Sequence, residues 1–424
     1  MWRAGYQLLL WLAFPVIVAR LCWRGRREPG YRQDIPGRFG WYRSAVAKKP
    51  IIWLHGVSLG ETRAAEPLVR VLQKRYPGHD LLLTQMTATG REAAVQLYGD
   101  EPGIVLAWLP YDYPSAMHRF LRHFKPRLGI ILETEIWPHL LHECRRQGVP
   151  VLLANARLSD RSSRRYQRFA PLLRESLSCF SAIGAQTAED AGRLEALGAP
   201  ADRIELTGSL KFDVEAPESA QILGQKLRER FGCRRVLLAA SLREGEEELL
   251  LDALQSAGGL PDNSLTVIVP RHPQRFDEVA GLFEQRGLAF IRRSSEAAIP
   301  DDCRFVLGDS LGELAAYYAA CDCAFVGGSL LPYGGQNLIE ACAAGVPVLL
   351  GPHTWNFAQA ADDAIAAGAA LRVPDAATLV NEAGYLLRNN EACRRMGAAG
   401  LAFCRRQRGA VAKTLALCER LLPD

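Results

Sequence analysis

The segment His55-Gly-Val-Ser-Leu-Gly-Glu61 combines a histidine, a serine, glycines and an acid at the point where an apolar run ends. The run, Ile51–Leu54, predicts a buried strand, and Thr62–Arg75 predicts the helix that follows. Glu61 then lies in the first turn, where a carboxylate is placed to take a proton from a substrate hydroxyl. The alternative, in which Glu61 only complements the helix dipole, has equal weight on the sequence alone.

The same segment contains Gly56-x-Ser58-x-Gly60, the pattern of the nucleophilic serine in α/β-hydrolases. In those enzymes earlier strands complete the sheet, and one of them leads into the oxyanion loop. Here Ile51–Leu54 is the first predicted strand of the body. A hydrolase with Ser58 as its nucleophile is therefore a minor alternative.

Acids also follow a second predicted strand, Leu128–Leu132, in the segment Glu133-Thr-Glu135-Ile-Trp-Pro138. Two carboxylates at the end of a buried strand are suited to orienting a substrate or holding a cation. In the alternative interpretation Thr134 and Glu135 cap the helix that Pro138 begins. The histidines are dispersed, and neither an H-E-x-x-H nor a D-x-D motif occurs, so no catalytic metal is expected.

Positive side chains follow three other predicted strands. They are Lys211 in Gly208–Asp213, Arg243 after Val236–Ala240, and Arg271-His272, held between two prolines, after Leu265–Val269. A single charge of this kind is usually a solvated surface charge. Cations on three converging loops favour a substrate that carries a phosphate or a carboxylate.

A glycine-rich stretch comprises Gly327-Gly-Ser329 and Pro332-Tyr-Gly-Gly-Gln-Asn-Leu-Ile-Glu340. Backbone N–H groups at a junction between a glycine-rich loop and a helix bind phosphate. Glu340 lies three residues after Asn337, on the same helix face, and is suited to accepting hydrogen bonds from the hydroxyls of a ribose. The alternative is an ordinary helix start with a surface glutamate. No G-x-x-x-x-G-K-[ST] occurs, which excludes a P-loop NTPase.

The elements that must position these residues are short apolar runs, rich in Val, Ile and Leu, separated by stretches of helix length. The predicted strands are Ile51–His55, Leu81–Gln85, Ile104–Leu109, Leu128–Leu132, Val151–Asn155, Ala182–Gln186, Ile204–Thr207, Val236–Ala240, Leu265–Val269, Ala289–Ile291, Phe305–Leu307, Ala324–Gly327 and Val348–Leu350. This alternation predicts two α/β domains with doubly wound parallel sheets, separated near Asp213–Ser219. The active site is expected at the carboxyl ends of the strands, in a cleft between the domains.

The N-terminal segment predicts a membrane anchor. Leu8–Ala19 is an unbroken apolar run, and Ala4–Trp23 reaches the ~20 residues that span a bilayer, although Pro15 weakens a straight helix. Arg24-Gly-Arg-Arg27 follows and, under the positive-inside rule, keeps the body in the cytoplasm. A cleaved signal peptide is less favoured because no small-residue cleavage site follows. The segment is long enough to span the bilayer and apolar enough to lie in its interface.

The composition, with 49% hydrophobic and 23% charged residues in a chain of 424, is typical of a globular protein of two or three domains. Residues 1–49 hold ten lysines and arginines against two acids, a net charge of +8, whereas the whole chain carries only +5. This distribution favours an anionic membrane surface over a nucleic acid as partner. Eleven scattered cysteines without a C-x-x-C pair indicate reduced thiols in the cytosol.

Taken in order, these segments resemble the motifs of the bacterial 3-deoxy-D-manno-octulosonic acid (Kdo) transferases, which act in the assembly of the lipid A core. The resemblance extends over nearly the whole chain. The segments that carry it are Arg24–Arg27, Pro29–Arg32, Arg38–Gly40, His55–Glu61, Thr84–Gly90, Glu133–Pro138, Asn155–Ser159, Gly208–Asp213, Pro270–Pro273, Gly327–Glu340 and Gly351–Thr354.

The resemblance implies a GT-B glycosyltransferase that needs neither metal nor cofactor. Its parts would be a membrane anchor with a basic flank at 1–27, a Rossmann-like acceptor domain at 28–212 and a Rossmann-like donor domain at 213–424. The donor would be CMP-Kdo and the acceptor a tetraacyldisaccharide 4′-phosphate precursor of lipid A (lipid IVA), with inversion at the anomeric centre. The enzyme would be held at the anionic surface on the cytoplasmic side of the inner membrane.

The resemblance also implies roles for individual residues. Glu61 would be the general base, Glu133 and Lys211 would stabilise charge, and Glu135 is a further candidate beside them. The contacts to CMP would come from Arg271, His272, Gly312, Glu313, Leu314, Asn337, Leu338, Ile339 and Glu340.

The glycine-rich stretch departs from the family pattern at three positions. Gln336, Ile339 and Ala341 stand where histidine, leucine and proline are frequent. Glutamine forms hydrogen bonds but carries no charge, which argues against a cationic role at position 336. Two alternatives of other kinds stay open: a GT-B transferase that uses a different nucleotide sugar, and a membrane-tethered binding protein without catalysis.

Overall fold

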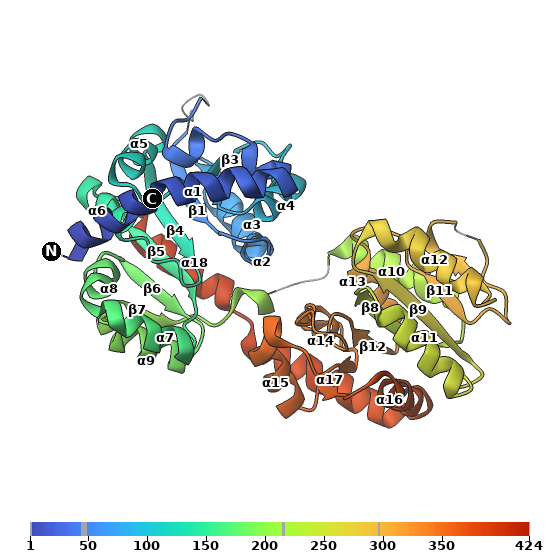
Figure 1. Ribbon diagram of the computed structural model, residues 1–424. Coiled ribbons are helices and arrows are strands. Elements are labelled where there is room, and N and C mark those ends of the chain that lie inside the picture. The colour runs from blue at the N-terminus through green and yellow to red at the C-terminus, as the bar shows by residue number, and fades with distance from the viewer. Residues whose placement is uncertain (1, 44–48, 214–216, 296, 424) are drawn as a thin grey trace. The chain divides into compact units, whose positions relative to one another are not determined.

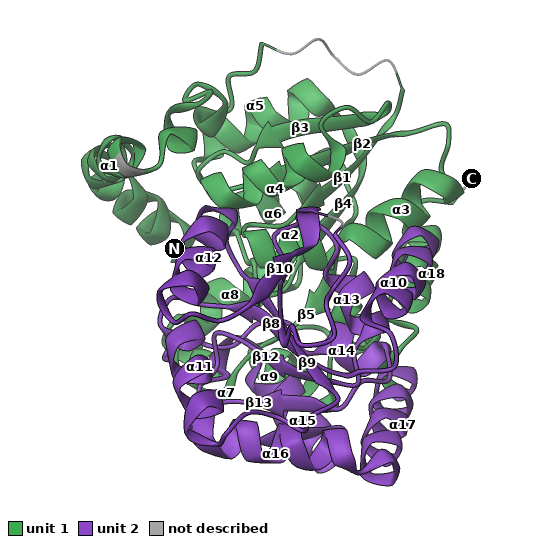
Figure 2. Ribbon diagram, turned by 90° about the vertical axis from the view of Figure 1, so that its right-hand side faces the viewer, with its two compact units in different colours: residues 1–213, 407–424 green, residues 214–406 purple. Residues whose placement is uncertain are grey.

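The computed structural model describes residues 2–43, 49–213, 217–295 and 297–423. Its chain forms two compact units (Figure 2). Unit 1 comprises Met1–Asp213 together with Gln407–Asp424, and unit 2 comprises Val214–Arg406. Each unit contains one parallel sheet between helices, so the fold is that of two Rossmann-like α/β units.

Unit 1 is built on a seven-stranded parallel sheet in the order β3-β2-β1-β4-β5-β6-β7. Its strands are β1 (Ile51–His55), β2 (Asp80–Gln85), β3 (Ile104–Trp108), β4 (Pro126–Leu132), β5 (Val151–Ala156), β6 (Ala182–Ala185) and β7 (Ile204–Leu206). Its helices are α1 (Trp2–Arg27), α2 (Leu59–Ala64), α3 (Glu66–Arg75), α4 (Ala88–Tyr98), α5 (Pro114–Phe124), α6 (Pro138–Gln147), α7 (Asp160–Tyr166), α8 (Ala170–Leu177), α9 (Ala188–Ala196) and α18 (Ala410–Leu421).

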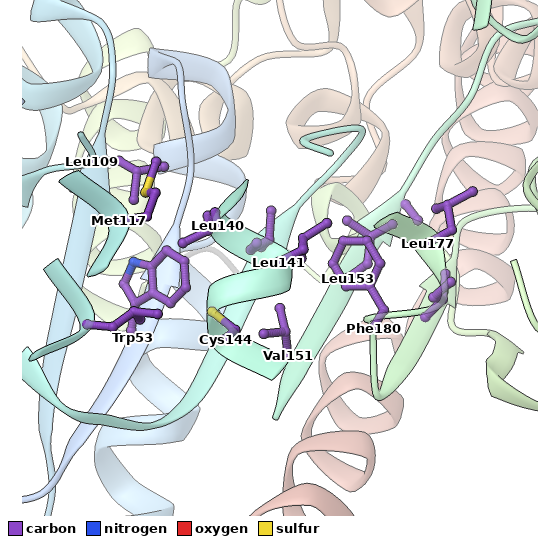
Figure 3. Packing of buried hydrophobic residues seen from close by; sticks show 14 of the residues in the cluster. Trp53, Leu109, Met117, Leu140, Leu141, Cys144, Val151, Leu153, Leu177 and Phe180 are labelled. Atoms are coloured by element: carbon purple, nitrogen blue, oxygen red, sulfur yellow. The ribbon is translucent and has the colours of Figure 1, made fainter. Parts of the chain in front are cut away.

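Alternate residues of β1 enter two different hydrophobic cores. Trp53 packs on one face of the sheet with residues of α5 and α6, including Leu140 (Figure 3). Ile52 and Leu54 face the other way and pack with Leu68 of α3. Because side chains of a strand alternate between faces and both faces are covered, β1 is apolar at each position from Ile51 to Leu54. This is why continuous apolar runs marked the strands in the sequence.

Unit 2 has the strand order β10-β11-β9-β8-β12-β13-β14, and all of its strand pairs are parallel. Its strands are β8 (Arg235–Leu242), β9 (Ser264–Pro270), β10 (Phe290–Arg292), β11 (Phe305–Leu307), β12 (Cys323–Val326), β13 (Val348–Leu350) and β14 (Ala370–Arg372). Its helices are α10 (Glu218–Phe231), α11 (Glu246–Ser256), α12 (Phe276–Gln285), α13 (Leu314–Ala320), α14 (Ile339–Ala343), α15 (Ala358–Ala366), α16 (Ala376–Arg388) and α17 (Asn390–Gln407, which ends at the boundary with unit 1).

Each predicted strand is present, with ends that shift by at most two residues. The sequence analysis missed β14, a three-residue strand at the edge of its sheet within an alanine-rich stretch. The predicted helix Thr62–Arg75 is two helices, α2 and α3, which meet at Ala65. The break occurs because Pro67 occupies the first turn of α3 and supplies no N–H to continue the preceding helix.

The expected division into 28–212 and 213–424 differs from the observed units at the C-terminal end. Leu417 and Cys418 of α18 are buried in the core of unit 1. The Asp213 carboxylate accepts hydrogen bonds from the backbone N–H groups of Gly409, at 2.6 Å, and Val411, at 2.5 Å, and so caps this helix. The sequence of an amphipathic helix does not indicate which sheet the helix covers, so the position of α18 was not predictable. Residues 214–216 of the expected boundary lie outside the described residues.

The N-terminal apolar segment is one helix, α1, which continues through Pro15. By length and composition Trp2–Arg26 suffices to cross a membrane, with a mean hydropathy of 1.6 over its most apolar 18 residues. In Figure 1 α1 runs across the surface of unit 1, drawn in dark blue.

Candidate active site

Glu61 lies in the first turn of α2, as predicted. Ser58 caps this helix, since its side-chain oxygen accepts a hydrogen bond from the Glu61 backbone N–H at 3.4 Å. The Glu61 carboxylate accepts hydrogen bonds in return, from the Ser58 hydroxyl at 2.9 Å and from the Val57 N–H at 2.6 Å. This reciprocal pattern is a variant of the capping box. It holds the carboxyl group, in a residue only 9% exposed, against the loop that follows β1.

Burial and the negative charge of Glu133 raise the pKa of Glu61 to about 7, even though the hydrogen bonds from Ser58 and Val57 lower it. A carboxyl group with this pKa gains and loses a proton near neutral pH, as a general base must. Burial and the charges of Glu61 and Glu133 raise the pKa of Glu135 to about 7 as well. The three acids therefore form one electrostatically coupled cluster.

Lys211 is the cation of this cluster. Its Nζ lies 3.7 Å from Oε1 of Glu133. Glu133 directly follows β4, whereas Lys211 lies in the 3₁₀ turn Leu210–Phe212 after β7, at the far edge of the sheet. The lysine thus reaches across the ends of β5 and β6. The structure brings together Glu61, Glu133 and Lys211, which the sequence predicted separately.

Strained backbone marks the same edge of each sheet. Glu133, Asn155 and Ser241 have φ of 58°, 54° and 57°. Glu133 directly follows β4, and Asn155 and Ser241 are the penultimate residues of β5 and β8. They are three of the five non-glycine residues with positive φ among those described. This left-handed conformation costs about 1–3 kcal/mol in such residues and is found preferentially at functional sites.

The role of Asn155 was not found from the sequence. Its side chain is buried, and its Oδ1 accepts a hydrogen bond from the Leu210 N–H at 3.1 Å. The Gln186 side chain donates to the backbone carbonyl of Asn155 at 2.9 Å. Asn155 thereby fixes the turn that carries Lys211. The one signal was its place directly after an apolar run, in a segment that matched the family pattern.

The geometry of Ser58 and His55 does not support a serine hydrolase. Ser58 has an ordinary extended backbone, with φ −115° and ψ 169°, and its hydroxyl is committed to Glu61. His55 Nδ1 lies 2.9 Å from the Thr84 hydroxyl, and burial lowers the pKa of His55 to about 3. A nucleophile elbow instead needs a sharp, strained turn. Ser58 is therefore best explained as the cap of α2.

The second group of predicted residues lies at the carboxyl ends of the unit 2 strands. Arg271 follows β9, and its Nε donates to Gln336 Oε1 at 3.2 Å. Arg243 follows β8; its Nη1 lies 3.1 Å from His272 Nε2, and its guanidinium lies over the Tyr333 ring, 4.6 Å from the ring centre. Two arginines and a histidine thus meet the glycine-rich stretch at one edge.

His272 is not one of the cations there. Burial and the positive charges of Arg243, Arg271 and Arg275 lower its pKa, so the imidazole is neutral at pH 7. Its Nε2 then accepts the hydrogen bond from Arg243. Gln336 matches this setting, because its neutral oxygen accepts from Arg271 where a protonated histidine would repel it. The departure at position 336 therefore suits a group that already carries two arginines.

Glu246 holds the glycine-rich stretch in place and was missed in the sequence. This fully buried carboxylate accepts hydrogen bonds from the backbone N–H groups of Arg243 at 2.9 Å, Gly328 at 2.6 Å and Leu330 at 2.9 Å. Glu246 begins a run of three glutamates, which is typical of a solvated helix start. Glu246 and Glu247 are both buried, and nothing in that run distinguished them from the partly exposed Glu248.

The loop from Gly327 to Glu340 is closed by its own backbone. Gly335 and Gln336 donate their N–H groups to the carbonyls of Gly328 and Gly327, at 2.6 and 3.1 Å. A Cβ at Gly327 would lie 2.7 Å from the Leu242 Cα, so only glycine fits where the loop passes β8.

The predicted helix start lies at Ile339, which begins α14. Leu338 precedes it, buried, while Asn337 accepts from the Ile339 N–H at 3.0 Å and donates to the Glu340 carboxylate at 2.8 Å. Asn337 therefore contacts Glu340, although it precedes the helix on which the two were expected to share a face.

Gly312, Glu313 and Leu314 lie after β11, at the start of α13. Gly312 has φ 77°, which glycine adopts without strain. The Glu313 carboxylate accepts from the Ser310 hydroxyl at 2.6 Å and pairs with Arg293, whose Nε lies 3.3 Å away. Since β11 neighbours β9 in the sheet, this loop lies next to the one that carries Arg271.

Within the described part of the chain, no group of three or more His, Cys, Asp and Glu side chains is arranged to hold a metal ion. The edge of unit 1 carries carboxyl groups and Lys211, and the edge of unit 2 carries arginines with backbone and amide groups.

Comparison with known proteins gives matches over both units. Residues 33–214 match the family model described as 3-deoxy-D-manno-octulosonic-acid transferase (kdotransferase), and residues 263–402 match that of the glycosyl transferases group 1. A 3-deoxy-D-manno-octulosonic acid transferase from Bordetella pertussis is 45% identical over 99% of both chains. The enzyme of that name from Haemophilus influenzae is 36% identical over 100% of this chain and 99% of its own.

Solved structures share the fold at much lower identity. The Staphylococcus aureus MnaA–UDP co-structure aligns with a TM-score of 0.56 at 13% identity, covering 88% of this chain and 98% of its own. A structure described as a UDP-N-acetylglucosamine 2-epimerase from Listeria monocytogenes aligns with a TM-score of 0.55 at 16% identity, over 88% and 96%. These likenesses show the two-domain GT-B architecture.

Proposed function

The chain belongs to the Kdo transferase family, and we propose that it transfers Kdo from CMP-Kdo to lipid IVA without a metal or a cofactor. The observation that carries the chemistry is the buried Glu61 carboxyl group with its pKa near 7. The donor and the acceptor are inferred from the family and from the charges at the two edges. The arginines of unit 2 can bind the phosphate and the carboxylate of such a donor. The carboxyl group of Glu61 can act as a base on an acceptor hydroxyl.

In the proposed reaction the Glu61 carboxylate takes the proton of an acceptor hydroxyl. The hydroxyl oxygen forms a bond to the anomeric carbon of Kdo from the face opposite the phosphate, so the centre inverts. The bond from that carbon to the CMP phosphate oxygen breaks, and CMP leaves with the electron pair. Lys211, paired with Glu133, would offset negative charge near the reacting groups.

The donor nucleotide is assigned to unit 2. Arg271 and Arg243 offer permanent positive charge to the CMP phosphate, and neutral His272 offers a hydrogen bond. Asn337 and Glu340 are assigned to the ribose, with Leu338 and Ile339 shaping the loop. Gly312, Glu313 and Leu314 complete the CMP contacts.

The test is an assay of the purified full chain with lipid IVA and CMP-Kdo generated in situ, with products resolved by mass. Wild type is expected to give adducts of one or more Kdo units, and the mass counts them. The Glu61→Gln variant is expected to give almost none, at unchanged thermal stability. Absence of adducts from the wild type, with a control transferase active in the same reagents, would reject the assigned donor or acceptor.

A further inference from the structure

The outer face of α1 is a continuous apolar surface. Seven large side chains along it expose about half or more of their area: Trp2, Leu8, Leu9, Trp11, Leu12, Val16 and Trp23. At 1.5 Å per residue they extend over about 32 Å. A contiguous apolar strip of this length is unusual on the surface of a soluble unit and marks a contact with a membrane or with another protein.

At the N-terminal end of α1, the opposite face of the helix contacts the rest of unit 1. The Arg3 guanidinium pairs with Glu175 of α8 at 3.3 Å and lies 2.9 Å from His142 of α6. One turn later the Tyr6 hydroxyl donates to the buried Asp112 at 3.1 Å. These are polar contacts with residues of the globular unit.

The attachment continues through the middle to the other end. The Tyr113 hydroxyl donates to the Leu10 carbonyl at 2.7 Å, and the Phe14 ring packs against Phe39 with centres 5.9 Å apart. Near the end of the helix Leu21 is buried with Tyr31 and Ala88. The rest of unit 1 therefore lies beside α1 along the whole helix (Figures 1 and 2).

This arrangement conflicts with a helix that crosses the bilayer. If α1 crossed, its N-terminal end would reach the far side and would draw Glu175, His142 and Asp112 into the hydrocarbon with it. Charged side chains there cost at least about 2.5–3.5 kcal/mol each. Spanning would otherwise require α1 to leave unit 1 and break every contact described above.

We propose that α1 lies in the plane of the membrane interface, with unit 1 covering its inner face and anionic lipid covering its outer face. An in-plane helix of this kind buries its apolar side at the boundary between headgroups and acyl chains. Tryptophans at both ends of the strip suit that depth.

The charges favour anionic lipid as the occupant over a second copy of the chain. Arg20, Arg26 and Arg32 are exposed near the C-terminal end of the strip, and α1 contains no acid. Basic side chains beside an apolar face attract anionic headgroups, at about 1 kcal/mol each. Two copies placed face to face with parallel helices would bring these arginines together, and an antiparallel pair would offer them no acid of α1.

The topology is tested with epitopes at both ends of the full chain, digested by protease in spheroplasts and in inverted inner-membrane vesicles. We expect both epitopes to be cut in inverted vesicles and both to be protected in spheroplasts. Cutting of the N-terminal epitope in spheroplasts, where a known periplasmic protein confirms access and a cytoplasmic one integrity, would show a spanning helix and overturn the proposal.

The occupant is tested with vesicles of phosphatidylethanolamine and phosphatidylglycerol, without donor or acceptor, so a failed transferase assay does not affect the result. The Leu12→Glu/Val16→Glu variant is expected to bind these vesicles at least about ten-fold more weakly. The matched Ile222→Glu/Leu249→Glu variant, altered at exposed apolar residues of unit 2, is expected to bind like wild type.

Both residues of the α1 variant are largely exposed, so an unchanged melting temperature is expected to confirm folding. Equal binding by the α1 variant and wild type would overturn the proposal. So would a wild-type dimer in solution that this variant converts to a monomer while vesicle binding persists, because the strip would then be a dimer interface.

Discussion

The carboxyl edges of the two sheets share one architecture and carry opposite chemistry. In unit 1 the edge holds three acids, with Glu61 and Glu135 buried enough to raise their pKa values to about 7. In unit 2 it holds Arg243 and Arg271, which contact a neutral histidine and a glutamine. The parallel strands determine where in each unit the site side chains lie. The types of those side chains determine whether the site can transfer a proton or bind an anion.

The two edges also differ in how burial is used. Burial shifts the proton affinity of a carboxyl group, which a base needs in order to work near neutral pH. An arginine keeps its charge in any protein environment, so it serves where a constant positive charge is required. Glu246, a buried carboxylate of unit 2, accepts three close backbone hydrogen bonds and is structural.

The largest effect is expected at the base of unit 1. Glu61→Gln keeps the shape of the side chain but removes its ability to take a proton, so kcat should fall about 10²–10⁴-fold. The measurement is the initial rate of Kdo transfer at saturating donor and acceptor. Glu66→Gln, at a half-exposed acid of α3 paired with Arg70, is the control and should retain full activity. A Glu61→Gln enzyme within a few-fold of wild type would assign the base elsewhere.

Next comes the structural carboxylate of unit 2. Glu246→Ala leaves the N–H groups of Arg243, Gly328 and Leu330 buried without an acceptor. At about 1–3 kcal/mol for each orphaned group, a loss of about 3 kcal/mol or more in the free energy of unfolding is expected. Chemical denaturation measures it. The comparable substitution Glu248→Ala, two residues on, should change stability little; equal effects would mean that Glu246 has no special role.

Binding of the donor should depend on Arg271. Loss of a charge-assisted hydrogen bond costs about 1.5–3 kcal/mol, so Arg271→Ala should weaken CMP binding about 10–100-fold. Calorimetric titration with CMP gives the dissociation constant. Arg286→Ala removes an arginine of unit 2 that pairs with Asp252 and should bind CMP as wild type does. If both variants bind alike, the phosphate site is not at β9.

The smallest effect is expected from the electrostatic coupling between Glu133 and Glu61 in unit 1. Because the carboxylate of Glu133 raises the pKa of Glu61, Glu133→Gln should lower that pKa. With Glu61 as the proposed base, activity requires its ionised form, so kcat/KM is expected to rise with pH through about 7 in the wild type. The rising limb of the variant should lie at lower pH, whatever its maximal rate. If the rising part of the pH profile stays in place or moves to higher pH in the variant, the charge of Glu133 does not raise the pKa of the base.

The strands and the site residues at their ends were predictable because both depend on local order along the chain. A strand buried on two faces must be apolar throughout, and residues after parallel strands meet at one edge. Glu61, Glu133, Lys211 and Arg271 were found in this way. Asn155 and Glu246 were not, because a buried polar side chain and a solvated one look alike in sequence when the partners are distant backbone groups.

By itself the sequence determined the strand series, the family and the acids and cations that follow the strands, since these depend on residue type and spacing. Tertiary structure alone decided which sheet α18 covers, that Glu61 is buried enough to titrate near pH 7, and that α1 lies along unit 1. Each of these depends on which surfaces meet and exclude water. Contacts between segments far apart in the chain determine which side chains are buried. Burial in turn sets the free-energy cost of ionising a side chain and decides which way an apolar face points.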